Sequence, residues 1–157
     1  MFRNVRRLMV SSALCALSVA ALGGEKHSLL GTWSVDVAKI QQPDKPKSVT
    51  LTLQEAGPDS YHMAVTIEAA DGSKSTAEGT FKPDGSANRV DGSQDIDVAS
   101  MTMPSKRMLV MGAGFAGHPA STRVWTLSDD GTHMIETAIR HLPDGTPYQR
   151  VFTWTRK

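Results

Sequence analysis

Apolar residues along most of this chain recur at every second position, and almost nowhere at the spacing of a helix. The clearest case is the segment 61–68, in which Tyr61, Met63, Val65 and Ile67 alternate with other residues. This period of two is typical of a β-strand with one buried face, because successive side chains point to opposite faces. The pattern predicts strands at about 33–37, 49–54, 61–68, 75–81, 98–103, 107–111, 122–127, 133–141 and 148–155.

Asp-Gly pairs lie between many of these segments. They occur at 71–72, 84–85, 91–92, 130–131 and 144–145. Glycine supplies the positive φ that a tight turn needs, so these pairs favour hairpins and an antiparallel meander. A sheet of about eight to ten strands hides its apolar face by closing into a barrel, which also removes exposed edges. We therefore expect an all-β barrel, with a two-sheet sandwich as the alternative.

Length and charge exclude several other classes. The 157 residues suit one domain, and 17 basic against 16 acidic residues disfavour a protein that binds nucleic acid by neutralising phosphates. The single cysteine, Cys15, excludes a disulfide framework and a zinc site built from cysteines.

The first 23 residues have the character of a secretory signal. Three arginines precede Leu8, the run 8–22 is apolar or small, and the charged pair Glu25-Lys26 follows the glycines. The run is shorter than the roughly 20 residues that span a bilayer as a helix. We expect a signal peptide over 1–23, a barrel domain over 24–157, and a periplasmic or secreted protein with no stable membrane anchor after cleavage. An uncleaved anchor is the alternative.

The triplet Gly31-Thr32-Trp33 resembles the Gly-x-Trp opening of lipocalins. The chain is most similar to small exported bacterial lipocalin-like proteins of unassigned function. Further pieces of that resemblance lie at 38–39, 47–52, 71–72, 122–124, 128–132 and 154–156. The resemblance implies a lipocalin-like, calycin-type antiparallel barrel of about 8–10 strands. It also implies that Arg156 lies across Trp33, next to Gly31, and closes one end of the barrel; a solvent-exposed terminal arginine is the alternative.

Polar side chains on the last strand suggest a ligand site. Tyr148, Arg150, Phe152 and Trp154 share one face, so inward-pointing aromatic rings would bring Arg150 and Tyr148 inward too. An arginine inside an apolar barrel grips a carboxylate strongly, because water is excluded. The pair is similar to the Arg-x-Tyr of fatty-acid-binding barrels in reversed order. The other candidate ligand-binding residues are Arg123, Tyr61, Met101 and Met103. The alternative places Arg150 and Tyr148 at the rim, facing water.

Two further motifs suggest other chemistry. Met101-Thr102-Met103 is locally similar to the Met-Thr-Met of small periplasmic copper-binding barrels, and thioethers suit Cu(I) or Ag(I); core packing is the alternative. The run Gly112–Gly117 spells a dinucleotide-binding fingerprint, which requires a following helix. Only four residues separate Gly117 from the strand expected at Thr122, so we expect a flexible glycine loop at the rim instead.

No catalytic motif stands out, so we expect no enzyme, no cofactor and no metal. Glu68, Glu78 and Glu136 are expected to face solvent, and Ile135 and Ile139 to face the core. The predicted function is the binding of a small hydrophobic or amphipathic molecule inside the barrel. A structural or interaction barrel with a filled core is the alternative, and the sequence does not predict the oligomeric state.

Overall fold

A computed structural model describes residues 28–41, 44–142 and 144–157, and this part of the chain forms ten antiparallel strands. One 3-10 turn, η1, covers Val37–Lys39. The strands are β1 Gly31–Val35, β2 Ser48–Glu55, β3 Tyr61–Glu68, β4 Lys74–Phe81, β5 Asp84–Arg89, β6 Val98–Ser105, β7 Met108–Phe115, β8 His118–Leu127, β9 His133–His141 and β10 Pro147–Arg156. The expected signal segment lies outside the described residues. Among the described residues, no helix has the length and apolar character to cross a membrane.

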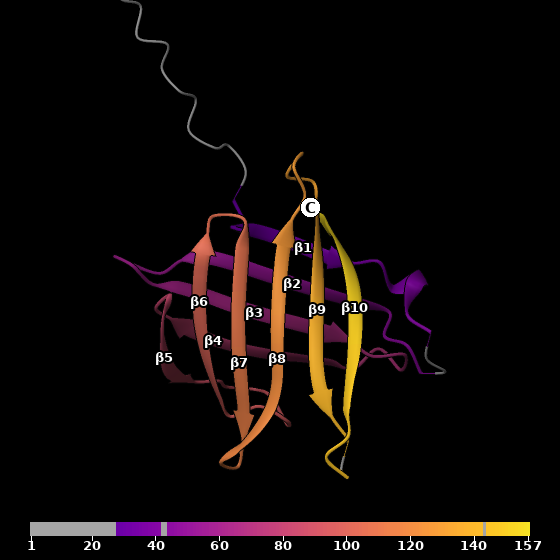
Figure 1. Ribbon diagram of the computed structural model, residues 1–157. Coiled ribbons are helices and arrows are strands. Elements are labelled where there is room, and N and C mark those ends of the chain that lie inside the picture. Colours follow the sequence, from indigo (N-terminus) through magenta and orange to yellow (C-terminus); the bar gives the residue numbers. More distant parts are fainter. Residues whose placement is uncertain (1–27, 42–43, 143) are drawn as a thin grey trace, which may run out of the picture.

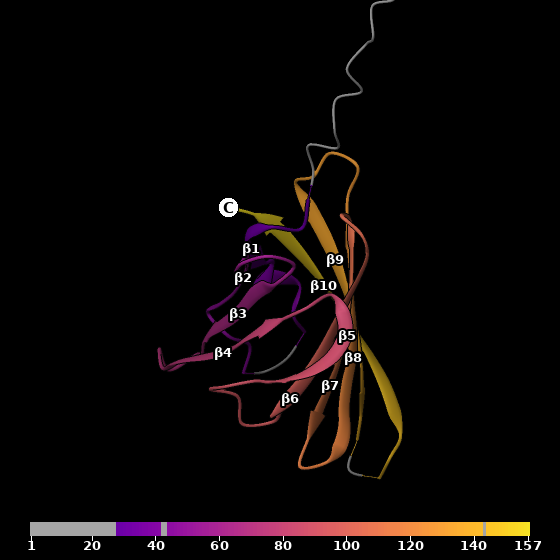
Figure 2. The same cartoon turned by 90° about the vertical axis from the view of Figure 1, so that its left-hand side faces the viewer.

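The strands form one sheet that curls into a nearly closed barrel. Consecutive strands pair with each other except β4 and β5, and β1 also pairs with β10, which gives the order β4-β3-β2-β1-β10-β9-β8-β7-β6-β5. Strands β1–β4 run across β6–β10 as a second wall (Figure 1), and the view from the side shows the two walls facing each other (Figure 2). The all-β meander and its barrel closure are therefore confirmed.

The two ends of this sheet, β4 and β5, meet in a narrow seam. There the backbone N–H of Glu78 donates to Asp91 O at 2.9 Å, and the N–H of Asp91 donates to Glu78 O at 2.8 Å. This is the one β-bridge between β4 and the segment after β5 in the described chain. Hydrogen bonding around the barrel is thus continuous except along this seam.

The Asp-Gly turns adopt the geometry that their sequence predicts. Gly72, Gly131 and Gly145 have φ of 91°, 70° and 85°, a region that side chains disfavour. In the same turns the preceding aspartate accepts a hydrogen bond from the backbone two residues later, as from Ser73 N to Asp71 Oδ1 at 2.9 Å. Such local bonds explain why aspartate rather than an apolar residue precedes these glycines.

The core is densest at the end of the barrel where the chain enters β1. Trp33 is completely buried, and Leu29 lies across this end with its N–H bonded to Lys106 O at 3.2 Å. The buried apolar residues that surround them come from both walls; they include Leu51, Leu53, Leu127, Met134 and Trp154. This end of the barrel is therefore filled with side chains.

Two local predictions are wrong. The strand β5 has no apolar alternation and was not expected, because its side chains are mostly exposed. The glycine run does not form a loop at the rim: β7 continues through Gly112 and Gly114 to Phe115, and only Ala116 and Gly117 turn the chain. At Gly114 an added Cβ would lie 3.0 Å from Val98 Cγ1, so close packing favours glycine at this position of β7.

The inward face of β9 is the reverse of the expected one. Met134, Glu136 and Ala138 point into the barrel and are buried, whereas Ile135 and Ile139 are each 43% exposed on the outside. Pairing with β8 and β10 fixes this register, because Glu136 stands between Trp125 and Phe152, which both point inward. The expectation that Glu136 faces solvent is therefore wrong.

Candidate functional site

A cavity of about 670 Å³ lies inside the barrel, away from the filled end. Its apolar lining comes from both walls and includes Met63, Val65, Phe81, Met111 and Trp125. The cavity has room because several of its wall residues are small, namely Ser75, Ala77, Gly79 and Ala99. A concave, mainly apolar space with a few polar groups is the usual form of a small-molecule site.

Arg123 is the predicted ligand residue that lines this cavity. It projects inward from β8, where its Nε donates to Ser121 Oγ at 3.3 Å and its Nη1 donates to Glu136 Oε1 at 3.0 Å. Its side chain is 22% exposed. These two bonds use Nε and Nη1, and the guanidinium has five N–H donors in all.

Glu136 lies behind Arg123 and is almost completely enclosed, with its side chain 1% exposed. Its second carboxylate oxygen, Oε2, accepts a hydrogen bond of 3.0 Å from Trp154 Nε1. Burial raises the pKa of Glu136, although the charge of Arg123 and the hydrogen bonds from Trp154 and Arg123 oppose that shift. The Trp125 indole also stabilises the charged form, but its Nε1 does not reach hydrogen-bond geometry.

A second guanidinium reaches the cavity from β9. Arg140 forms an ion pair with Asp95, which belongs to the segment that joins β5 to β6. Partial burial opposes ionisation of Asp95, but hydrogen bonds from Arg140 and Ser93 outweigh it, so the pKa of Asp95 lies below its ordinary value. The ion pair attaches this segment to β9.

The same segment forms part of the cavity wall. Val90 and residues 92–96 line it, and Ile96 packs against the apolar core. At the end of the segment, the Ala116 N–H donates to Asp97 Oδ2 at 2.9 Å. The connection between β5 and β6 is therefore held on both sides of Ile96.

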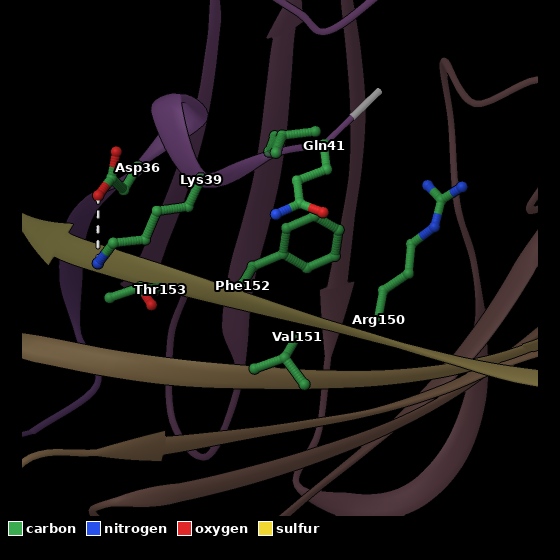
Figure 3. Close-up of a pocket in the computed structure, with 8 residues that line it drawn as sticks. Asp36, Lys39, Gln41, Arg150, Val151, Phe152 and Thr153 are labelled. Atoms are coloured by element: carbon green, nitrogen blue, oxygen red, sulfur yellow. Dashed lines mark ion pairs between the residues drawn. The ribbon is translucent and has the colours of Figure 1, made fainter. Parts of the chain in front are cut away.

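The side chains of Arg150 and Tyr148 project from the inner face of β10, which also carries Phe152. Arg150 stands at the same level as Arg123, because both residues pair with Ala138 of β9. The guanidinium carbon of Arg150 lies 5.5 Å from the centre of the Tyr148 ring. Arg150 lines a separate pocket of about 210 Å³ between β10 and the segment after η1, where Figure 3 shows Gln41 beside Phe152.

The other ligand candidates do not line the large cavity. Tyr61 stands opposite Phe81 and packs against the core at the far end of β3 from Ile67. Met101 is completely buried and pairs with Met111, while Met103 packs against the same core. Their role as thioether ligands remains a hypothesis, because their packing already accounts for their positions.

The closed end contains the arrangement suggested for Trp33 and Arg156. The guanidinium carbon of Arg156 lies 4.1 Å from the centre of the Trp33 ring. Its three nitrogens donate to the carbonyl oxygens of Gly131, Leu30 and Ser28 at 2.9, 2.8 and 2.6 Å. At Gly31, where φ is 124°, an added Cβ would lie 2.8 Å from Arg156 Nη1, so glycine makes room for this contact.

Sequence reasoning missed Arg140, Asp95 and Glu136 as site residues. Arg140 lies on the same face of β9 as Glu136, so the inverted register hid both residues. Asp95 lies in a segment without periodicity, and no local pattern connects it with Arg140. Knowing which face of β9 points inward would have indicated Glu136 and Arg140. One clue is that Trp154 and Arg123 are donors that need a buried acceptor.

Comparison with known proteins supports the fold. No known protein family and no curated protein matches the sequence. Among solved structures, a single-substitution mutant of the fluorescent protein UnaG has a TM-score of 0.52 and 17% identity, covering 82% of this chain and 96% of its own. A second mutant of the same protein has a TM-score of 0.48 and 15% identity, covering 82% and 95%. The first of these likenesses shows that the chain shares a β-barrel fold with that protein.

Proposed function

We propose that this chain is an exported lipocalin-like barrel that binds a small amphipathic molecule with an anionic group. The apolar part of the ligand occupies the 670 Å³ cavity, and its anion contacts Arg123 and Arg140. The proposal assigns binding rather than catalysis to this site. It places the protein in the periplasm or outside the cell, as the residues 1–23 suggest.

One observation carries the proposal: two guanidinium groups line a cavity with a mainly apolar interior, in which Glu78 and Asp95 are the acidic lining residues. A buried cation attracts an anion far more strongly than an exposed one, because little water competes for it. Each arginine also has an acidic partner, Glu136 or Asp95, which keeps the charge acceptable when no ligand is bound.

Calorimetry with 1-decanesulfonate tests this proposal, because its headgroup stays ionised and its chain is apolar. We expect one equivalent to bind the full-length protein, and Arg123→Ala to weaken binding at least tenfold. Arg107→Ala is the matched control, since Arg107 pairs with Asp129 and does not line the cavity; it should change affinity less than twofold. Equal effects of the two substitutions, or no binding by the unmodified chain, would contradict the proposal.

A specific observation favours a second candidate function, an interaction barrel acting through its surface. The outward positions of β7–β10 carry no Asp, Glu, Lys or Arg. Val124 and Val151 flank Thr137, with Ile135 and Ile139 on either side along β9, and Val151 is 56% exposed. Loss of charge is typical of the core of a protein interface, and the matching uncharged partner we consider is a second copy of the chain.

Sedimentation of the full chain separates this second candidate from the first. A dimer through this face should have twice the monomer mass of 16.9 kDa. The double variant Ile135→Lys/Val151→Lys should restore the monomer, and Gln54→Lys, an exposed outward position of β2, should not. A monomer at all concentrations would eliminate this candidate without affecting ligand binding.

A further inference from the structure

The carboxylate of Glu136 has an unusual position for a group that no catalytic step requires. It is almost fully buried on the inner face of β9, and its contact with Arg123 connects it to the cavity. Apolar packing could have filled this place, as it does at the neighbouring inward residues Met134 and Ala138. A charge is therefore kept where its removal from water is costly.

The contacts of the two carboxylate oxygens differ. Oε2 is fixed by the Trp154 indole, which packs in the core and can only donate. Oε1 accepts from Arg123, whose side chain also lines the cavity. A ligand anion that binds at Nη1 of Arg123 therefore competes for the contact made by Oε1, while the contact made by Oε2 stays unchanged.

Resting on the proposed function, we propose that an anionic ligand binds together with one proton, which Glu136 takes up at Oε1 as Arg123 turns to the ligand. The proton comes from solvent and forms an O–H bond on the carboxyl group; no other bond is made or broken. The resulting acid keeps its contact with Trp154 through Oε2 and donates its O–H to the ligand anion. The pair then shares one proton between two acidic groups, which avoids two adjacent negative charges.

The charged and titratable surroundings support this assignment. On β8, Arg123 is the only charge that acts on Glu136, together with the indole of Trp125. From β10, Arg150 and Tyr148 share the inner face, and on β9 itself Arg140 is already paired with Asp95. The facing wall contributes Met63 and Val65 from β3. The acidic residues Glu78 of β4 and Asp95 also line the cavity, and the charge of Arg123 acts on Asp95. The proton-accepting group closest to Arg123 is therefore Glu136, which burial already favours in its neutral form.

The experiment measures proton uptake when 1-decanesulfonate binds. Titrations of the full chain at pH 6, 7 and 8, each in two amine buffers that differ in ionisation enthalpy, give the number of protons from the difference in binding heat. We expect uptake approaching one proton and an affinity that falls up to tenfold per pH unit, because the anion and the proton bind together. The uncharged probe 1-decanol should bind without uptake and without pH dependence.

The variant Glu136→Gln identifies the group that takes up the proton. Its amide oxygen still accepts from Trp154, and it should bind the sulfonate with no proton uptake and a flat pH profile. In the unmodified chain, the carbon-13 shift of the Glu136 carboxyl group should move to that of the neutral acid as sulfonate is added; this readout does not depend on how the variant folds.

The failures are distinguishable. Binding of the sulfonate without proton uptake, or uptake that persists in Glu136→Gln, overturns this inference and leaves the proposed function intact. Binding of decanol but not of the sulfonate overturns both the inference and the anionic part of the proposed function. If neither probe binds, both proposals fail.

Discussion

Single residues do most to define the two ends of this barrel. At the closed end, Arg156 connects the last strand with the chain before β1 by one stack and three hydrogen bonds to carbonyl oxygens. At the open end, Arg123 and Arg140 are each paired with a carboxylate. The same type of side chain thus has a structural role at one end and lines the cavity at the other.

Truncation of Arg156 should destabilise the fold. Hydrogen bonds to charged groups contribute about 1.5–3 kcal/mol each but are not additive, so we expect Arg156→Ala to lower the free energy of unfolding by about 2–4 kcal/mol. Arg156→Lys should recover less than half of this, because an ammonium group cannot reach three carbonyls in one plane. Urea denaturation measures both, with the exposed Lys157→Ala as the control. Equal stability of Arg156→Ala and Lys157→Ala would show that the contacts contribute nothing.

The carboxyl group of Glu136 should make stability depend on pH. Its pKa in the folded state is raised by burial above its ordinary value of 4.5, so the native protein holds the proton more tightly than the unfolded chain. This contribution to stability is fully present below pH 4.5 and is lost as pH rises through the raised pKa. As the pH rises from 4 to 8, the Tm of the unmodified chain should therefore fall relative to the Tm of Glu136→Gln. A constant difference would contradict the raised pKa.

At the scale of elements, the sequence predicts most of the strands but not always their faces. The segment 61–68 is predicted to the residue, since its inward Met63 and Val65 alternate cleanly with other residues. The segment 133–141 is also predicted to the residue, but its apolar Ile135 and Ile139 point outward. Periodicity identifies two faces, and only pairing with β8 and β10 decides which one is buried. For the same reason, the sequence predicts Arg123 as a ligand-binding residue but not Arg140.

The seam between β4 and β5 rests on a close approach of two backbones. At Gly92, where φ is 74°, an added Cβ would lie 2.0 Å from Thr76 O. At Gly117 φ is 79°, and an added Cβ would meet nothing within 4 Å. The two glycines therefore have the same conformational requirement but different surroundings.

This pair gives a matched test of the seam. Gly117→Ala should cost about 1 kcal/mol of unfolding free energy, from the strained conformation alone. Gly92→Ala should cost about 2 kcal/mol more, because the backbone must shift, and it should speed hydrogen exchange at the amides of Glu78 and Asp91. If both variants lose the same stability and exchange alike, the close packing at Gly92 is unimportant.

At the scale of the whole molecule, the barrel combines a filled end with a hollow one. The filled end contains the large side chains Trp33, Trp154 and Leu29, whereas the hollow end has small residues on β4 and β6. The hollow part is not needed to hold the sheet together, because strand pairing and the filled end do so. Filling it should therefore abolish binding while leaving the fold intact.

The substitution Ala77→Phe tests this division. Ala77 lines the cavity, and its neighbour Thr76 points outward from the same strand. Ala77→Phe should weaken 1-decanesulfonate binding at least tenfold without lowering Tm by more than a few degrees, and Thr76→Phe should leave binding within twofold. If Thr76→Phe has the larger effect on binding, the ligand binds elsewhere.

The seam also determines how the molecule can fluctuate. Two backbone hydrogen bonds join Glu78 and Asp91, whereas neighbouring strands elsewhere are paired along most of their length. Parting at this line breaks these two bonds and leaves every hairpin intact, whereas parting any other pair of neighbouring strands breaks a whole ladder. We therefore expect the barrel to open locally along this line before any other, so that the cavity wall next to the seam is its most easily widened part.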